Sequence, residues 1–216
     1  MAAIEAKLNT GSSECGNRSR KEAILSGMGG LGKTQIGLEY AYRLQDHYSG
    51  IFWLDGKNAD TIDSSWQRIL ERLIAHYSTK YPNDPDFARV AADLDIKGQL
   101  TPDGQLVRKP TKMACEIVKD WLARPGNDNW FLVIDGYDNV KELCMSNNVP
   151  CCNHGHILLS SRVRAVCEEV GGEVIEVPEF DTRTGLSLLI NSTGCVLEEL
   201  QEKGSALPSP CEILRG

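Results

Sequence analysis

Residues 27–34 read GMGGLGKT and match the pattern GxxxxGK[ST]. A short apolar run, residues 22–26 (EAILS), precedes this motif, and a helical pattern over residues 33–48 follows it. Glycines allow the backbone to turn tightly and to bring a row of N–H groups against phosphate oxygens, with no Cβ in the way. The first turn of the following helix adds the positive end of its dipole. The order of strand, glycine-rich loop and helix therefore predicts a loop that binds the phosphates of a nucleotide.

Two side chains at the end of the motif indicate the chemistry of the bound group. Lys33 supplies a flexible cation to the β- and γ-phosphates, and the Thr34 hydroxyl is a ligand for Mg²⁺. We also predict that Lys33 is accessible to solvent when the site is empty. A plain glycine-rich turn with a solvated lysine is the alternative, but such a turn does not need four glycines that end in Lys-Thr. The predicted nucleotide-binding residues are Gly27, Met28, Gly29, Gly30, Leu31, Gly32, Lys33, Thr34, Gln35 and Asp135.

A second apolar run, residues 130–134 (WFLVI), ends in the carboxylate of Asp135. Ligands of parallel sheets bind beyond the carboxyl ends of the strands, so we expect Asp135 beside the glycine-rich loop. A carboxylate at that place holds Mg²⁺ through water. An Asp at a strand end also often caps the next turn, which Gly136 completes. Because the phosphate loop lies upstream, we favour the metal role and predict Thr34 and Asp135 as the metal ligands.

The other apolar runs predict the architecture. Continuously apolar runs are typical of strands that are buried on both faces, and helix-length segments separate them here. The predicted strands are residues 22–26, 51–54, 130–134, 157–160 and 174–177. The predicted helices are residues 33–48, 62–77, 86–95, 112–124, 163–170, 182–190 and 195–202. The fold class is therefore α/β, a parallel sheet flanked by helices on both faces.

Composition and charge limit the kinds of partner and compartment that we expect for this chain. The chain has 216 residues, of which 41% are hydrophobic and 25% are charged, as in ordinary globular proteins. The formal net charge of −7 gives no overall electrostatic signal for nucleic-acid binding, so we predict no nucleic-acid partner, although the net charge leaves room for a local basic groove. The longest apolar run, residues 130–134, is far shorter than a membrane helix, and we predict no membrane partner. Residues 1–20 lack the apolar stretch of a secretory signal, which favours a soluble cytoplasmic protein.

Eight cysteines are compatible with this compartment, because thiols stay reduced in the cytoplasm. Cys144, Cys151, Cys152, His154 and His156 are potential zinc ligands, but they crowd one short loop. Structural zinc sites usually have two well-separated pairs of ligands. We interpret the five residues as reduced loop cysteines and solvated histidines.

The chain resembles the NB-ARC nucleotide-binding domains of STAND P-loop NTPases, the central switches of NOD-like receptors, and it looks most like the fungal type. The resemblance covers roughly residues 22–191. Four segments carry it in the same order: residues 27–43 (GMGGLGKTQIGLEYAYR), 50–56 (GIFWLDG), 130–139 (WFLVIDGYDN) and 156–162 (HILLSSR).

This resemblance implies an ASCE-type sheet with strand order 5-1-4-3-2, and ADP or ATP with Mg²⁺ as the ligand. It also implies that Arg162, at the end of the 157–160 strand, senses the γ-phosphate. From the sequence alone, Arg162 could simply open a surface helix.

Many family members have a second acid after the metal-binding Asp, where this chain has Gly136. Asp138 can substitute for it, so the candidate catalytic residues are Asp138 and Arg162. We expect nucleotide binding with slow or negligible hydrolysis, because hydrolysis needs an oriented water.

The resemblance also implies a truncated domain. We expect residues 1–20 to be a disordered tail, residues 21–203 to be the nucleotide-binding domain, and residues 204–216 to be a remnant of the next subdomain. Without the subdomains that close over the nucleotide, the site would be open and wet on one side. Apolar residues in the segment 195–200 would then favour self-association or binding to other NLR-like proteins.

Three functions fit the sequence. The first is an ADP/ATP-binding module of a signalling switch, as in innate immunity. The second is an active Mg²⁺-dependent ATPase or small phosphotransferase that uses Asp138 as its base. The third is a degenerate fragment that pairs with a full-length relative, whose partner binding would survive the change Lys33→Ala. We favour the first.

Overall fold

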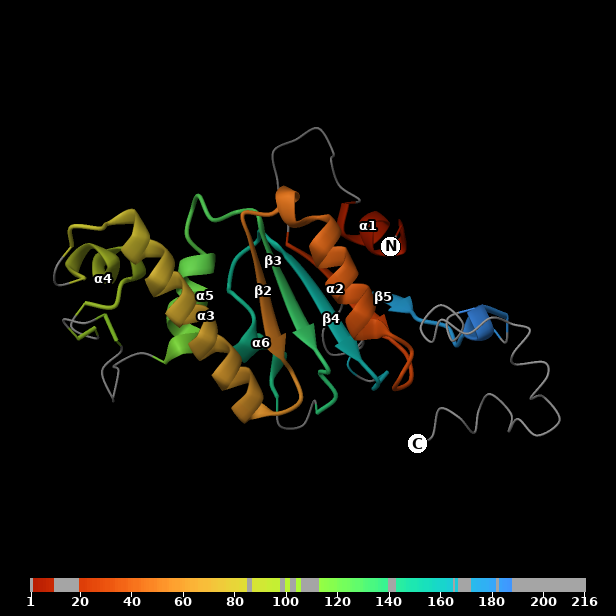
Figure 1. Cartoon of the computed structure of the whole chain (residues 1–216). Coiled ribbons are helices and arrows are strands. Elements are labelled where there is room, and N and C mark those ends of the chain that lie inside the picture. Colours follow the sequence, from red (N-terminus) through yellow and green to blue (C-terminus); the bar gives the residue numbers. More distant parts are fainter. Residues whose placement is uncertain are drawn as a thin grey trace, which may run out of the picture. The chain divides into compact units, whose positions relative to one another are not determined.

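The computed structural model describes residues 2–9, 20–84, 87–97, 100–101, 104–105, 113–139, 143–164, 166, 172–181 and 183–187. The chain divides into two compact units, Met1–Val177 and Pro178–Gly216. The first unit holds a sheet with helices around it (Figure 1). In the second unit, residues 183–187 are helical, and the Thr184 N–H donates a 2.7 Å hydrogen bond to the Asp181 carboxylate at the start of that turn.

Five parallel strands form one sheet in the order β2-β3-β4-β1-β5. The strands are β1 (Lys21–Ser26), β2 (Gly50–Asp55), β3 (Trp130–Asp135), β4 (His156–Ser161) and β5 (Glu173–Glu176). The prediction of an α/β fold with strand order 5-1-4-3-2 is confirmed. Because all strands run the same way, the carboxyl ends of β1, β3 and β4 meet at one edge, where Ser26 pairs with Ser161 and Ile134 with Leu159.

The predicted helices at residues 33–48, 62–77, 86–95 and 112–124 are present to within a few residues, whereas the helices at residues 2–9 and 145–148 were not predicted. The helices are α1 (Ala2–Asn9), α2 (Lys33–Arg43), the 3-10 turn η1 (Gln45–His47), α3 (Ala59–Lys80), α4 (Ala88–Leu94), α5 (Ala114–Leu122) and α6 (Met145–Asn148). The predicted helix over residues 33–48 is thus divided into α2 and η1. The predicted helices at residues 163–170 and 195–202 lie mostly or wholly outside the described residues.

Side chains of the strands alternate between two cores, one on each face of the sheet. On one face, Leu132 and Leu159 pack with buried residues of α3 and α5. On the other face, Val133 and Leu158 pack with buried residues of α1 and α2. Figure 1 shows α3 and α5 on one side of the strands and α1 and α2 on the other. No helix in the described part of the chain is both long and apolar enough to cross a membrane.

The N-terminal residues differ from the prediction. Residues 2–9 form the helix α1, and its Ile4 and Leu8 are each only 1% exposed. They lie in one core with Ala23 and Leu25 of β1. The prediction of a disordered tail is therefore wrong for residues 2–9, whereas residues 10–19 lie outside the described residues. The predicted boundary near residue 203 also lies outside them.

Candidate functional site

The glycine-rich loop joins β1 to α2 at the carboxyl edge of the sheet. Gly30 and Gly32 both have φ of 82°, a left-handed conformation that glycine adopts without penalty. A Cβ added at either residue would meet nothing within 4 Å, so the loop is open above both of them. Helix α2 begins at Lys33 directly after Gly32, and the N–H groups of its first turn have no acceptor within the helix. A loop and helix end of this kind suit a bound anion.

Lys33 lies within this loop rather than in solvent. Its residue is 8% exposed, and its Nζ donates hydrogen bonds to the carbonyl oxygens of Gly27 at 2.6 Å and Met28 at 2.7 Å. The prediction that Lys33 is accessible in the empty site is therefore wrong. Burial lowers the pKa of the Lys33 ammonium, and the carboxylates of Asp138 and Asp135 act against this shift. An ammonium has three N–H donors, and the described residues accept two of those of Lys33, which leaves one for a phosphate oxygen.

The two predicted metal ligands are in contact. Thr34 Oγ1, at the start of α2, donates to Asp135 and lies 3.0 Å from each of its carboxylate oxygens. Ser160 of β4 also donates to Asp135, at 2.5 Å, and accepts a 2.8 Å hydrogen bond from the Gly136 N–H. Mg²⁺ prefers oxygen ligands and commonly takes one carboxylate, waters and phosphate oxygens for the rest of its coordination. The donor set at Thr34 and Asp135 fits this ion.

A second polar pair follows the same strands. Asp138 lies beyond β3, and its Oδ2 accepts a 2.6 Å hydrogen bond from Nε of Arg162, which lies beyond β4. Asp138 Oδ1 accepts from the Arg162 backbone N–H at 2.6 Å and from Ser161 Oγ at 3.2 Å. Burial raises the pKa of Asp138, but the hydrogen bonds and charge of Arg162 and the Ser161 hydroxyl outweigh it, so the pKa is lower than usual. A weakly basic carboxylate that already accepts three hydrogen bonds disfavours the hypothesis that Asp138 is a general base.

The guanidinium group of Arg162 lies next to the glycine-rich loop. A Cβ added at Gly29 would lie 3.6 Å from Arg162 Cδ and 3.9 Å from Arg162 Nη1. The Arg162 side chain is 64% exposed, so it reaches solvent on the same side as the open loop. The structure therefore brings the predicted catalytic pair close to the predicted phosphate loop.

Sequence reasoning missed Ser160 and Ser161, which hold the two carboxylates in place. Both are buried, with 4% and 0% of their surface exposed. Ser161 Oγ also accepts a 3.0 Å hydrogen bond from the Val163 N–H, which fixes the turn after β4. The available signal was a pair of hydroxyl residues at the end of an apolar strand, because buried hydroxyls require hydrogen-bond partners.

The loop cysteines and histidines do not come together as one site. His154 Nε2 lies 3.0 Å from the carbonyl oxygen of Leu122, and His156 Nδ1 lies 2.8 Å from the Tyr48 hydroxyl. Both imidazoles are half-buried, so the interpretation of solvated histidines is wrong. Within the described residues, no three His, Cys, Asp or Glu side chains are grouped as metal ligands, and the described cysteines form no disulfide.

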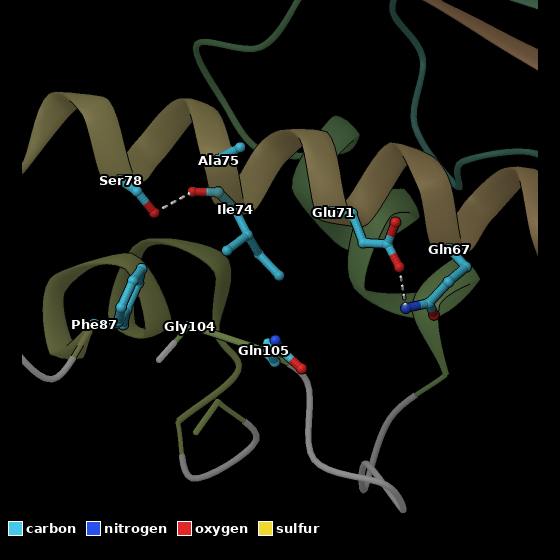
Figure 2. A pocket seen from close by; sticks show the side chains of 8 residues that line it. All are labelled: Gln67, Glu71, Ile74, Ala75, Ser78, Phe87, Gly104 and Gln105. Carbon is cyan, nitrogen blue, oxygen red and sulfur yellow. Dashed lines mark hydrogen bonds between the residues drawn. The ribbon is translucent and has the colours of Figure 1, made fainter. Parts of the chain in front are cut away.

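A hollow of about 490 Å³ lies away from the site, between α3 and the segment that contains Phe87 and Gln105. Figure 2 shows that its polar side chains bond locally: Gln67 donates to Glu71, and Ser78 donates to the Ile74 carbonyl. None of the predicted site residues lines it. The phosphate loop does not need such a hollow, because an anion is held by backbone N–H groups at a surface turn.

Comparison with known proteins agrees with the sequence motifs. No protein-family model matches the chain. In an alignment of 193 residues that covers 81% of this chain, the chain is 25% identical to a curated "Nucleotide-binding leucine-rich repeat (NLR)-like protein" from Hyaloscypha variabilis. The chain spans 16% of the length of that relative. It is also similar to a solved STAND protein with a tetratricopeptide repeat sensor from Pyrococcus horikoshii, with 12% identity, a TM-score of 0.43, and coverage of 92% of this chain and 26% of that one. The resemblance to NLR-like proteins is confirmed by the first comparison.

Proposed function

We propose that this chain is an ADP- and ATP-binding module, with Mg²⁺, of a switch in an NLR-like signalling protein. The observation that carries this proposal is the contact between Thr34 and Asp135 at the open end of the glycine-rich loop. It combines an oxygen donor set for a metal with a row of backbone N–H groups for phosphates. The name of the curated relative supports a nucleotide as the ligand.

Each residue then has a distinct part in binding. The N–H groups of residues 29–34 bind the phosphates, and the remaining N–H donor of Lys33 reaches a phosphate oxygen. Thr34 and Asp135 hold Mg²⁺, which neutralises phosphate charge when it is bound. Arg162, whose side chain lies beside Gly29, would contact the third phosphate of ATP, and Gln35 supplies an N–H in the first turn of α2.

We propose that hydrolysis is slow or absent. Gly136 stands where a second acid would follow Asp135, and the carboxylate of Asp138 is occupied by Arg162 and Ser161. A carboxylate whose pKa is lowered by these partners is a weak base for the attacking water. The active ATPase that uses Asp138 as base is the second candidate, and it requires the attacking water to bond to Asp138 Oδ2, which accepts one hydrogen bond from Arg162. Association with a second copy or with another NLR-like protein, in the cytoplasm, would carry the signal.

Calorimetric titration with ADP and ATP, with and without Mg²⁺, tests the proposal. We expect the unmutated chain to bind both nucleotides and Lys33→Ala to lose at least about tenfold in affinity, because a hydrogen bond between charged groups is lost. Lys80→Ala is a matched control, since Lys80 is an exposed lysine of α3 that pairs with Asp93. Equal affinity of the unmutated chain and Lys33→Ala would refute the phosphate assignment.

Single-turnover hydrolysis separates the two candidates. Slow or no release of phosphate is expected from the unmutated chain. Measurable turnover that disappears in Asp138→Ala, with ATP binding retained, would instead support the ATPase.

A further inference from the structure

We infer that Asp138 is a positioning residue, which fixes the guanidinium of Arg162 beside the glycine-rich loop so that the site distinguishes a nucleoside triphosphate from a diphosphate. This inference rests on the proposed nucleotide-binding function. It assigns Asp138 a role in ligand selection in place of a role in proton transfer.

Asp138 holds Arg162 through two hydrogen bonds. Its carboxylate accepts both the backbone N–H and the side-chain Nε–H of Arg162, each at 2.6 Å. One bond is to the backbone and the other is to Nε in the guanidinium group, so together they fix the direction of the arginine side chain as well as its position. Ser161 Oγ donates to the same carboxylate, which keeps Asp138 itself from turning away.

These two hydrogen bonds leave most of the N–H donors of the Arg162 guanidinium available for a phosphate. A guanidinium carries five N–H donors, and Asp138 takes only the one on Nε. No hydrogen bond within the described part of the chain takes the donors on the two Nη atoms, and Nη1 lies on the side of Gly29. A planar fork of this kind matches the oxygens of a phosphate.

Exposure shows which member of the pair meets the ligand. The Arg162 side chain is 64% exposed, whereas that of Asp138 is 20% exposed. An approaching phosphate therefore contacts the arginine, with the carboxylate behind it. Holding a long side chain in its binding conformation beforehand reduces the conformational entropy that is lost when the ligand binds.

A purely electrostatic role of Asp138 predicts the opposite effect of its removal on ATP affinity, so one experiment distinguishes the two roles. Removal of the Asp138 carboxylate leaves Lys33 and Arg162 with one less negative charge nearby, and both interact with Asp138. If Asp138 acted only through its charge, Asp138→Asn would strengthen the binding of both ADP and ATP. If Asp138 positions Arg162, the same change weakens the binding of ATP selectively.

The experiment is calorimetry of Asp138→Asn with Mg²⁺-ATP and Mg²⁺-ADP. Asparagine keeps the shape and one acceptor oxygen but loses the ion pair, so we expect an approximately fivefold loss for ATP and less than twofold for ADP. Asp46→Asn, in the exposed turn η1, is the control and leaves both affinities unchanged. Circular dichroism establishes that each variant is folded.

A double-mutant cycle shows whether Asp138 acts through Arg162. In an Arg162→Ala background, Asp138→Asn is expected to have no further effect on ATP affinity. Arg162→Lys keeps the charge but loses the Nε–H bond, so it is expected to show the same selective loss as Asp138→Asn and does not depend on the folding of that variant.

The possible failures are distinguishable. If the unmutated chain binds neither nucleotide, the proposed function itself is wrong. If it binds both nucleotides but Asp138→Asn raises both affinities, leaves them unchanged, or lowers ATP affinity equally in the Arg162→Ala background, the positioning role is overturned and nucleotide binding stands.

Discussion

The two ends of the sheet use the same backbone conformation in opposite surroundings. At the carboxyl ends, Gly30 and Gly32 have φ of 82° and nothing within 4 Å of an added Cβ. At the amino ends, Gly155 has φ of 83° and packs directly against the ring of Trp130. Left-handed glycines thus open one end for a ligand and close the other by packing.

Polar groups show the same contrast. At the amino ends, Tyr48 and His156 bond to each other at 2.8 Å, and Tyr48 stacks on Phe131 with ring centres 5.0 Å apart. At the carboxyl ends, Thr34 and Asp135 bond across an open loop where a metal can replace their contact. We therefore expect that changes at the amino ends alter stability, whereas changes at the carboxyl ends alter ligand binding.

The largest expected effect is on stability, from Gly155→Ala. The new methyl group would overlap the buried ring of Trp130, and alanine is strained at φ of 83°. Overpacking and left-handed strain together should lower the free energy of unfolding by about 3 kcal/mol or more. Urea denaturation measures this loss.

Gly126→Ala is the matched control for that change. Gly126 also has a positive φ, 95°, but an added Cβ meets nothing within 4 Å. Only the backbone strain remains, so the expected loss is about 1 kcal/mol. Equal losses in the two variants would mean that packing on Trp130 does not close the amino end.

The next effect in size is on ligand binding, from Asp135→Asn. Because a neutral amide is a poorer ligand for Mg²⁺, the Mg²⁺-dependent part of ATP affinity should fall by about tenfold or more, while stability changes little. Calorimetry in Mg²⁺ and in EDTA measures the difference. Asp55→Asn is the control, because Asp55 occupies the same register at the end of β2 and pairs with Lys57. An unchanged Mg²⁺ dependence in Asp135→Asn would remove Asp135 from the metal site.

Local patterns explain what the sequence could predict. The motif at residues 27–34 and the apolar run ending at Asp135 are contiguous, so the loop and the strands could be located directly. The strand order could not, because neighbours in a sheet are set by long-range packing; it came from the resemblance. The same limit applies to α1, whose Ile4 and Leu8 are buried only because β1 lies beneath them.

The finer geometry of the site had no local signal. Lys33 folds back onto the carbonyls of its own loop, although we predicted that it is accessible to solvent in the empty site. Asp138 and Arg162 are 24 residues apart, and their pairing follows from the adjacency of β3 and β4. Sequence therefore predicted which residues gather at this edge, but not which of them bind one another.

A smaller effect is expected from Tyr48→Phe at the amino ends. The change removes the hydroxyl that bonds to the half-buried His156 and keeps the ring on Phe131. Loss of one such hydrogen bond should lower the free energy of unfolding by about 1 kcal/mol, with no change in nucleotide affinity. Tyr42→Phe, on the exposed side of α2, is the control. A loss of ATP affinity in Tyr48→Phe would show that the two ends are coupled.

The smallest effect is a pH dependence that belongs to the amino ends alone. Burial lowers the pKa of His156, and the nearby charge of Lys21 lowers it further. Between the folded pKa and the unfolded value near 6.5, the unfolded chain binds a proton that the folded chain does not. The free energy of unfolding should therefore fall as the pH drops below about 6.5, and it should fall less steeply in His156→Gln.

Urea titrations from about pH 7.5 to 5 measure how steeply the free energy of unfolding depends on pH in both proteins, with His47→Gln in the exposed turn η1 as control. Parallel curves for the unmutated chain and His156→Gln would mean that the imidazole is not sheltered, and that the amino end is less closed than the contacts of Tyr48 indicate.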